Sequence, residues 1–141
     1  MNVSLRWLRQ IAPQLDGSAH ELSERLAELG FPVESVHEIG ALLSDIVVAR
    51  IVEARAHPNA DRLRLCSVDA GTGELLSVVC GAPNARADAT FPFIPVGGTL
   101  PGGMSIRKAK IRGERSFGML CSARELGLGT DHDGLLELRT D

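Results

Sequence analysis

The stretch from Arg107 to Leu128 reads RKAKIRGERSFGMLCSARELGL, and the rest of the chain is interpreted around it. Its first half holds the only basic cluster of the sequence, in which five cationic residues stand against one acid, Glu114. The five are Arg107, Lys108, Lys110, Arg112 and Arg115. A cluster of this kind suits a polyanion such as a nucleic-acid backbone. A solvated protein surface explains it equally well at this stage.

The spacing of the basic cluster predicts a strand over residues 105–112. Side chains alternate between the two faces of a strand, so Lys108, Lys110 and Arg112 would share one face. Ala109 and Ile111 would then point toward a core. Ile106 and Arg107 break this alternation, which indicates a bulge or the beginning of the strand at that point.

The second half of the stretch predicts a buried strand followed by a helix. Met119-Leu120-Cys121 is short and apolar, as buried strands are. Ser122 and Glu125 have the spacing of a capping box, in which each side chain accepts a backbone N–H of the other residue. We therefore expect a short helix that begins after Ser122 and ends near Gly127 or Gly129.

The first 39 residues predict a small α/β piece. Ser4 to Ile11 has an N-cap serine and helical apolar spacing, and a second capping box at Ser18 and Glu21 begins a clearer helix. Val33 to Ile39 alternates weakly, as a strand would. Two short helices and one strand cannot bury their apolar faces alone, so this piece needs a partner surface.

Gly40 to Asp45 marks a boundary, after which the composition becomes that of a β protein. The strands predicted after the boundary are Ile46–Ala54, Leu63–Asp69, Leu75–Cys80, Thr90–Val96, the basic strand, Met119–Cys121 and Leu135–Leu138. His57 to Leu63 is predicted as a turn. Two prolines confine Thr90–Val96 to an edge or an irregular segment. About five closely spaced strands with Gly/Pro turns indicate a small antiparallel barrel.

Composition limits the class of protein. The chain has 141 residues, 44% of them hydrophobic, and a net charge of −3. Residues 1–45 carry −4, and residues 46–141 carry +1. Cys66, Cys80 and Cys121 have apolar neighbours and form no Cys-x-x-Cys pair, so we expect buried thiols in a reducing compartment. The sequence shows no membrane-length apolar run or signal peptide, and we expect a soluble, cytoplasmic protein.

Three candidate sites each lack a residue that their chemistry requires. We therefore predict neither a catalytic nor a metal-binding residue. The glycines of residues 97–103 lack the Gly-Lys-Ser/Thr of a P-loop. Residues 131–134 begin like a calcium loop, but the bidentate acid is missing. His57 with a cysteine has no third group to orient it as a general base.

Four collinear motifs closely resemble the tRNA-binding OB-fold module of several aminoacyl-tRNA synthetases and small tRNA-binding proteins. They are His57–Leu63, Cys80–Asn84, Lys108–Gly113, and Ser116 with Gly118–Ser122. Val3–Leu8, Glu125–Leu128 and Asp131–Gly134 narrow the resemblance to the start of the bacterial phenylalanyl-tRNA synthetase β subunit. The resemblance covers essentially the whole chain.

The resemblance implies a mainly β fold: a five-stranded OB-type barrel over residues 40–141, with residues 1–39 as the first half of a split α/β domain. We expect a piece of a longer β subunit that works in an α2β2 assembly with the synthetase α subunit. ATP and magnesium would act in the parent ligase, outside this chain, and no cofactor is expected here. The expected partner is tRNA, with no membrane or DNA.

The resemblance, together with the basic strand, supplies the candidate tRNA-binding residues. The primary candidates are Lys108, Lys110, Arg112 and Arg115. Asn59, Arg62, Arg64 and Asn84 are added because they sit in the matching loops. Aromatic residues are scarce, so recognition would rest on charge and shape. The alternative is a structural module that stabilises the assembly without touching tRNA.

Overall fold

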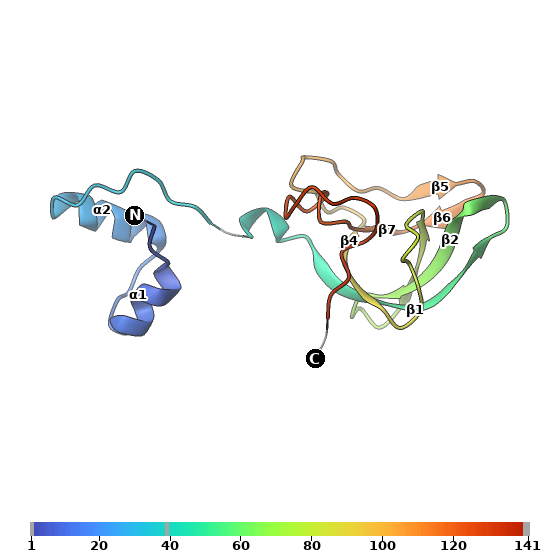
Figure 1. Ribbon diagram of the computed structural model, residues 1–141, viewed down its shortest axis with the longest axis horizontal. Helices are drawn as coiled ribbons and strands as arrows, with labels where there is room; N and C mark the ends of the chain where they lie inside the picture. Colours follow the sequence, from blue (N-terminus) through green and yellow to red (C-terminus); the bar gives the residue numbers. More distant parts are fainter. Residues whose placement is uncertain (1, 39, 140–141) are drawn as a thin grey trace. The chain divides into compact units, whose positions relative to one another are not determined.

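The computed structural model describes residues 2–38 and 40–139. The chain divides into two compact units, Met1–Ile39 and Gly40–Asp141 (Figure 1). Across the described ranges, no helix is both long enough and apolar enough to cross a membrane.

The first unit is formed by two capped helices. Helix α1 spans Leu5–Ile11, and Ser4 Oγ accepts the Trp7 N–H at its N-terminus. Helix α2 spans Ala19–Glu28, and the capping box between Ser18 and Glu21 is complete, with distances of 2.6 and 3.2 Å. Both predicted helices are confirmed, because capping depends on residues three positions apart.

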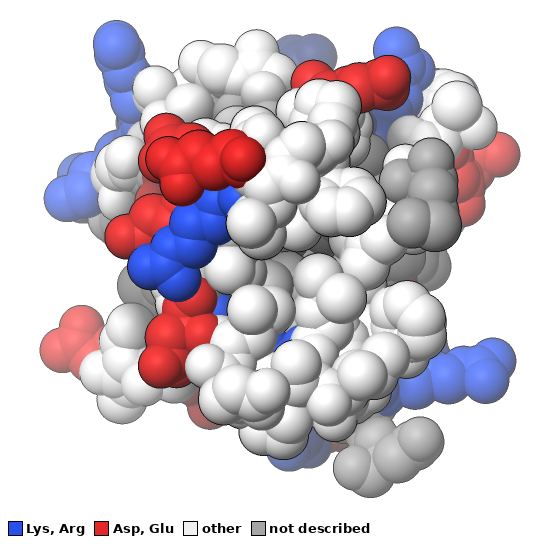
Figure 2. Space-filling model, turned by 90° about the vertical axis from the view of Figure 1, so that its left-hand side faces the viewer, with Lys and Arg blue, Asp and Glu red and all other residues white. Residues whose placement is uncertain are grey.

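The strand predicted for Val33–Ile39 does not form over residues 33–38, and Ile39 lies outside the described residues. A strand needs hydrogen bonds to a neighbouring strand, and this unit provides none to residues 33–38. Apolar side chains of the unit are also exposed, including Trp7 at 56% and Leu29 at 73%. Much of the surface drawn in Figure 2 is uncharged.

The second unit begins with a 3-10 turn, η1 (Ala41–Leu43), and is organised by one antiparallel sheet. The sheet has the strand order β3-β2-β1-β4-β7. The strands are β1 (Val47–His57), β2 (Ala60–Asp69), β3 (Leu75–Cys80), β4 (Thr90–Pro95) and β7 (Gly118–Leu120). The predicted turn at His57–Leu63 is therefore tighter than expected, because β1 and β2 extend into it.

The sheet closes into a barrel where β3 meets the chain just before β7. Phe117 N–H donates to the Ser77 carbonyl at 2.9 Å, and Val79 N–H donates to Ser116 Oγ at 3.1 Å. The five-stranded OB-type barrel is thus confirmed. Gly118 has φ of +144°, and a Cβ there would lie 2.2 Å from the Phe93 ring. A glycine is required at this position because the backbone passes directly over a core aromatic.

Strand β4 lies inside the sheet, so the prediction that its prolines confine it to an edge was wrong. Its register with β1 ends at Phe93, and its register with β7 begins there. Pro95 lies past the end of the β1 register. The Pro92 carbonyl accepts the Cys121 N–H beyond the end of β7. A proline has no backbone N–H to donate. Pro95 lies where the pairing with β1 has ended, and Pro92 lies where the pairing with β7 has ended, so neither proline removes a hydrogen bond that the sheet needs.

The β4 side chains contribute to two hydrophobic clusters. Phe91 and Phe93 belong to the barrel interior, together with Ile51, Val68 and Val78. Ile94 belongs to a second cluster with Leu100, Ile106, Cys121 and Leu126. This burial on both faces agrees with the place of β4 between β1 and β7.

The end of the chain differs from its prediction in two places. Ser122 and Glu125 form the expected capping hydrogen bonds, but only a turn follows, which Gly127 closes with φ of +68°. The predicted strand Leu135–Leu138 is reduced to one isolated bridge, between Thr90 and Leu138. Each prediction was wrong in extent because local signals start an element but tertiary contacts decide its length.

Candidate nucleic-acid interface

The basic cluster forms a separate two-stranded hairpin, in place of the predicted single strand of the barrel. Its strands are β5 (Ala109–Ile111) and β6 (Glu114–Ser116). Arg112 (φ +51°) and Gly113 (φ +101°) form the two-residue turn between them. Two successive residues with positive φ are typical of a type I′ turn, which matches the twist of the flanking strands.

This turn corrects two details of the predicted strand. Arg112 lies in the turn and therefore does not alternate with Lys108 and Lys110 on one strand face. Ala109 is exposed instead of facing a core. The side chains of Lys108, Lys110, Arg112 and Arg115 are all solvent-exposed.

Lys110 and Arg115 are directly opposite each other in the β5–β6 register. Side chains at such positions lie on the same face with their Cβ atoms about 5 Å apart, and like charges there are destabilising. Glu114 pairs with Ile111 and so points to the other face. The hairpin therefore presents two adjacent cations on a face without an acid of its own.

Lys108 and Phe117 flank this pair of cations. The Lys108 ammonium lies 5.6 Å from the centroid of the Phe117 ring, within the range of a cation–π contact. A shallow hollow of about 250 Å³ is lined by Lys108, Ala109, Lys110, Arg115, Ser116 and Phe117. The hollow thus combines three cations with one aromatic ring, a combination that suits nucleic acid.

The β1–β2 turn holds the hairpin in place. Asn59 N–H donates to His57 Nδ1 at 3.0 Å, so the other ring nitrogen, Nε2, carries the proton and donates to the Ile111 carbonyl at 3.2 Å. The Asn59 amide also donates to the Arg112 carbonyl at 3.3 Å. His57 is only 5% exposed. The His-Pro-Asn motif therefore positions the basic turn.

The remaining basic candidates, Arg62 and Arg64, lie on β2 shortly after this turn, and both are exposed. They are two residues apart and share one side of the strand. Neither lines the hollow beside the hairpin. The structure thus brings Asn59 to the hairpin and leaves these arginines on the neighbouring barrel surface.

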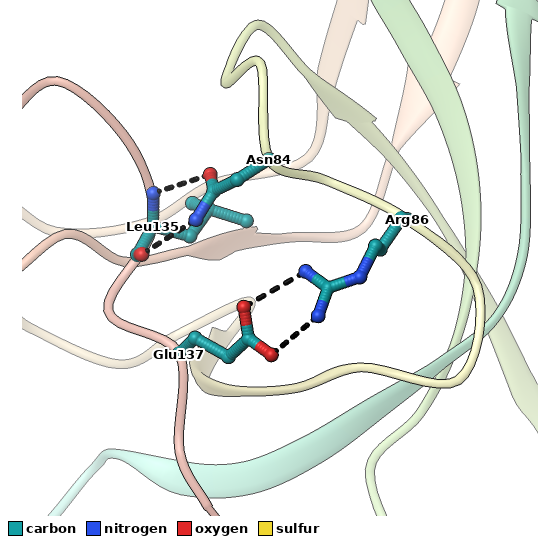
Figure 3. A network of polar contacts seen from close by, with 4 residues as sticks. All are labelled: Asn84, Arg86, Leu135 and Glu137. Atoms are coloured by element: carbon teal, nitrogen blue, oxygen red, sulfur yellow. Dashed lines mark hydrogen bonds and ion pairs between the residues drawn. The ribbon is translucent and has the colours of Figure 1, made fainter.

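Asn84 is held elsewhere, in a set of contacts that we call the clamp: Asn84, Arg86, Leu135 and Glu137 (Figure 3). Its amide donates to the Leu135 carbonyl at 2.9 Å and accepts the Leu135 N–H at 2.8 Å. Arg86 makes two hydrogen bonds to the Glu137 carboxylate, at 2.6 and 2.8 Å. Asn84 thus uses its amide to fasten the C-terminal segment to the barrel.

Ion pairing separates the basic hairpin from two arginines of the second unit, Arg50 and Arg86. In residues 2–38 and 40–139 the ion pairs are Arg50–Asp88 and Arg86–Glu137. Within those ranges, no carboxylate is paired with Lys108, Lys110, Arg112 or Arg115. A cation without a protein partner keeps its full charge available to a ligand.

The three cysteines lie in the interior of the second unit and are unpaired thiols. Burial raises the pKa of Cys66 to about 11 and that of Cys121 to about 12, and it also raises the pKa of Cys80. Thiols with such raised pKa values are poor nucleophiles at neutral pH. No cluster of three or more His, Cys, Asp or Glu side chains that could hold a metal occurs in the described part of the chain.

Sequence reasoning missed Phe117 as a candidate site residue because it counted aromatic residues over the whole chain. The signal was local: Phe117 follows Arg115 by two residues and directly precedes Gly118. Its role depends on Lys108, which reaches it only because the chain reverses at the Arg112–Gly113 turn.

The barrel, the basic hairpin and the matching motifs define a nucleic-acid-binding module, and the comparison with known families agrees. The chain belongs to the tRNA-binding domain family, because the family model described as "Putative tRNA binding domain" matches residues 46–141. Several relatives that match nearly the whole chain are phenylalanine–tRNA ligase beta subunits. The resemblance inferred from the motifs is thereby confirmed.

Three such relatives show the extent of the match. The beta subunit of Nitratidesulfovibrio vulgaris is 50% identical over 98% of this chain and 17% of the relative. That of Bordetella parapertussis is 54% identical over 94% of this chain and 16% of the relative. That of Xanthomonas campestris is 52% identical over 100% of this chain and 18% of the relative. The chain thus spans about a sixth of the length of these relatives.

Proposed function

We propose that this chain is the tRNA-binding module of a phenylalanine–tRNA ligase beta subunit and that it holds tRNA by its phosphates through the β5–β6 hairpin. The observation that carries the proposal is the cross-strand pair of Lys110 and Arg115. Two cations held side by side destabilise the protein. A phosphate between them removes that repulsion and accepts hydrogen bonds from both.

The same proposal covers the activity, cofactors and assembly of the longer protein to which this chain would belong. The parent would attach phenylalanine to its tRNA with ATP and magnesium, in the cytoplasm, as an α2β2 assembly with an α subunit. Residues 1–39 would be half of a split domain, and their exposed apolar side chains support a partner surface there. This chain alone would bind no cofactor and catalyse no amino-acid activation. Phenylalanine-dependent exchange of pyrophosphate into ATP by the purified chain would refute that point.

Phosphate contacts position a nucleic acid without reading its sequence, so different tRNAs should bind with nearly equal affinity. Neutralising about three or four phosphates predicts a slope of log affinity against log salt of roughly −2 to −3, at about 0.7 per contact on single-stranded regions. The measurement is a titration of fluorescently labelled tRNA at several salt concentrations.

Two triple variants provide the test. Changing Lys108, Lys110 and Arg112 to Ala should weaken binding and flatten the salt slope by about two units. Changing Arg6, Arg9 and Arg25 of the acidic first unit to Ala should have little effect. If the two variants behave alike, or if the unaltered chain shows no salt-sensitive binding, the module stabilises the assembly without direct tRNA contact.

A further inference from the structure

The hollow beside the hairpin differs from a purely electrostatic surface because its lining includes an aromatic ring. We propose that it takes one unpaired nucleotide, with the base stacked on Phe117 and the flanking phosphates on Lys110 and Arg115. The inference rests on the proposed function and deepens it. It assigns a single-stranded RNA segment, instead of the backbone of a duplex, as the ligand of this site.

The backbone that carries the Phe117 ring is held by the barrel. The Phe117 N–H donates to the Ser77 carbonyl at 2.9 Å, where the barrel closes. On one side of it, Ser116 Oγ accepts the Val79 N–H at 3.1 Å and donates to the Gly118 carbonyl at 3.2 Å. Beyond it, Gly118 lies against the Phe93 ring. A ring carried by backbone held on both sides can stack a base with little loss of conformational freedom.

The face of the ring is covered by a group that can move. The Lys108 ammonium lies 5.6 Å from the ring centroid, and the Lys108 side chain is exposed. At exposed sites such cation–π contacts are weak, whereas the stacking of a base on an aromatic side chain is stronger. A base can therefore replace the ammonium over the ring, and the displaced Lys108 gains a phosphate partner.

The lining of the hollow also suits one nucleotide, because it offers a ring for the base and cations for the phosphates. The cross-strand pair Lys110 and Arg115 lies in the lining of the same hollow as the ring. A base and its own phosphates have this arrangement, because the sugar holds the phosphates beside the base. In a duplex the bases are paired and stacked, so the ring could not be used.

The test compares two RNA ligands and two variants of the 141-residue chain. The ligands are an oligouridine of about ten nucleotides, near the site size of an OB fold, and a blunt RNA duplex without unpaired bases. Phe117→Leu keeps an apolar side chain against the barrel but removes the ring. Phe117→Trp restores a ring and is the matched control.

Phe117→Leu should weaken oligouridine binding by about tenfold, since stacking contributes roughly that much per base or more. Its salt slope should stay unchanged, because the phosphate contacts remain. Duplex binding should change less than twofold, and Phe117→Trp should bind oligouridine within about threefold of the unaltered chain. In a Trp7→Phe background, oligouridine should quench the fluorescence of the new tryptophan, whereas the duplex should not.

Two outcomes would overturn the inference while leaving the proposed function intact. One is an equal loss of both ligands by Phe117→Leu, and the other is an unchanged oligouridine affinity with normal salt dependence. Absence of salt-dependent binding by the unaltered chain would instead overturn the proposed function. Thermal unfolding of each variant shows whether a loss of affinity comes from a loss of fold.

Discussion

The β5–β6 hairpin and the clamp both place charged side chains on the surface of the same unit, but they arrange them in opposite ways. In the hairpin, Lys110 stands opposite Arg115, and no carboxylate in the described chain pairs with either. In the clamp, Arg86 meets Glu137 through two hydrogen bonds. Charges that satisfy each other contribute to the fold, whereas like charges held together lower its stability and remain available to a ligand.

The clamp also shows why a motif residue need not be a binding residue. Asn84 lies in one of the motifs that indicate the family, but both ends of its amide are used by the Leu135 backbone. Gly134 belongs to the same contact, since a Cβ there would lie 2.7 Å from Asn84 Oδ1. The clamp joins parts of the chain 51 residues apart, so we expect its loss to affect stability and not RNA affinity.

The largest expected effect is the loss of folding stability when the clamp is broken. Asn84→Ala should lower the free energy of unfolding by about 2–4 kcal/mol, because two hydrogen bonds are lost and two backbone groups of the buried Leu135 keep no partner. Urea denaturation measures this change. The folded fraction should bind tRNA within about twofold of the unaltered chain. A specific loss of affinity in a stable variant would make Asn84 a binding residue after all.

The next effect is on binding through the hairpin. The double variant Lys110→Ala/Arg115→Ala should lower tRNA affinity by about 10–30-fold at low salt and reduce the salt slope by about 1.4. The matched control, Arg50→Ala/Arg86→Ala, removes the same charge from arginines that are already paired with acids. If the control lowers affinity as much as the hairpin variant, net charge and not the hairpin governs binding.

A smaller effect is expected from a charge reversal at Lys110, which should raise folding stability and lower tRNA affinity. Lys110→Glu converts the like-charged pair into an attractive pair with Arg115 and should raise the free energy of unfolding by about 0.2–1 kcal/mol. The same change should lower tRNA affinity, because an acid now occupies the phosphate site. Thermal unfolding and tRNA titration of one sample measure both. A loss of stability would mean that the two side chains do not interact in the folded protein.

The smallest effect concerns the pH dependence of the clamp. The hydrogen bond from Arg86 lowers the pKa of Glu137 from its usual value of 4.5. The stabilisation by this pair is therefore fully present above pH 4.5 and is lost as the pH falls through the lowered pKa of the folded state. Both side chains are exposed, so the effect should be small. Glu137→Gln should remove it, and unfolding midpoints at neutral and acidic pH measure the difference.

The candidate site was predictable from the sequence only in part. The sequence identified the basic cluster and its exposed side chains, because a run of cations has few alternatives to the surface. It could not show that Arg112 turns the chain back, that Lys110 then faces Arg115, or that Lys108 reaches Phe117. Each of these contacts depends on where a strand ends, and strand ends are set by pairing with other segments.

By itself, the sequence determined the elements whose signals are local. Ser4 and Ser18 cap their helices through hydrogen bonds to residues three positions away, and the capping box of Ser122 and Glu125 forms even where no helix follows. The alternation and turns of the second unit were enough to indicate the barrel. Only the tertiary structure decided that β4 lies inside the sheet, that β7 is its fifth strand while the basic segment forms a hairpin, and that Asn84 serves the fold. The physical reason is that pairing between distant segments is selected by packing of the whole core, which no short window of sequence contains.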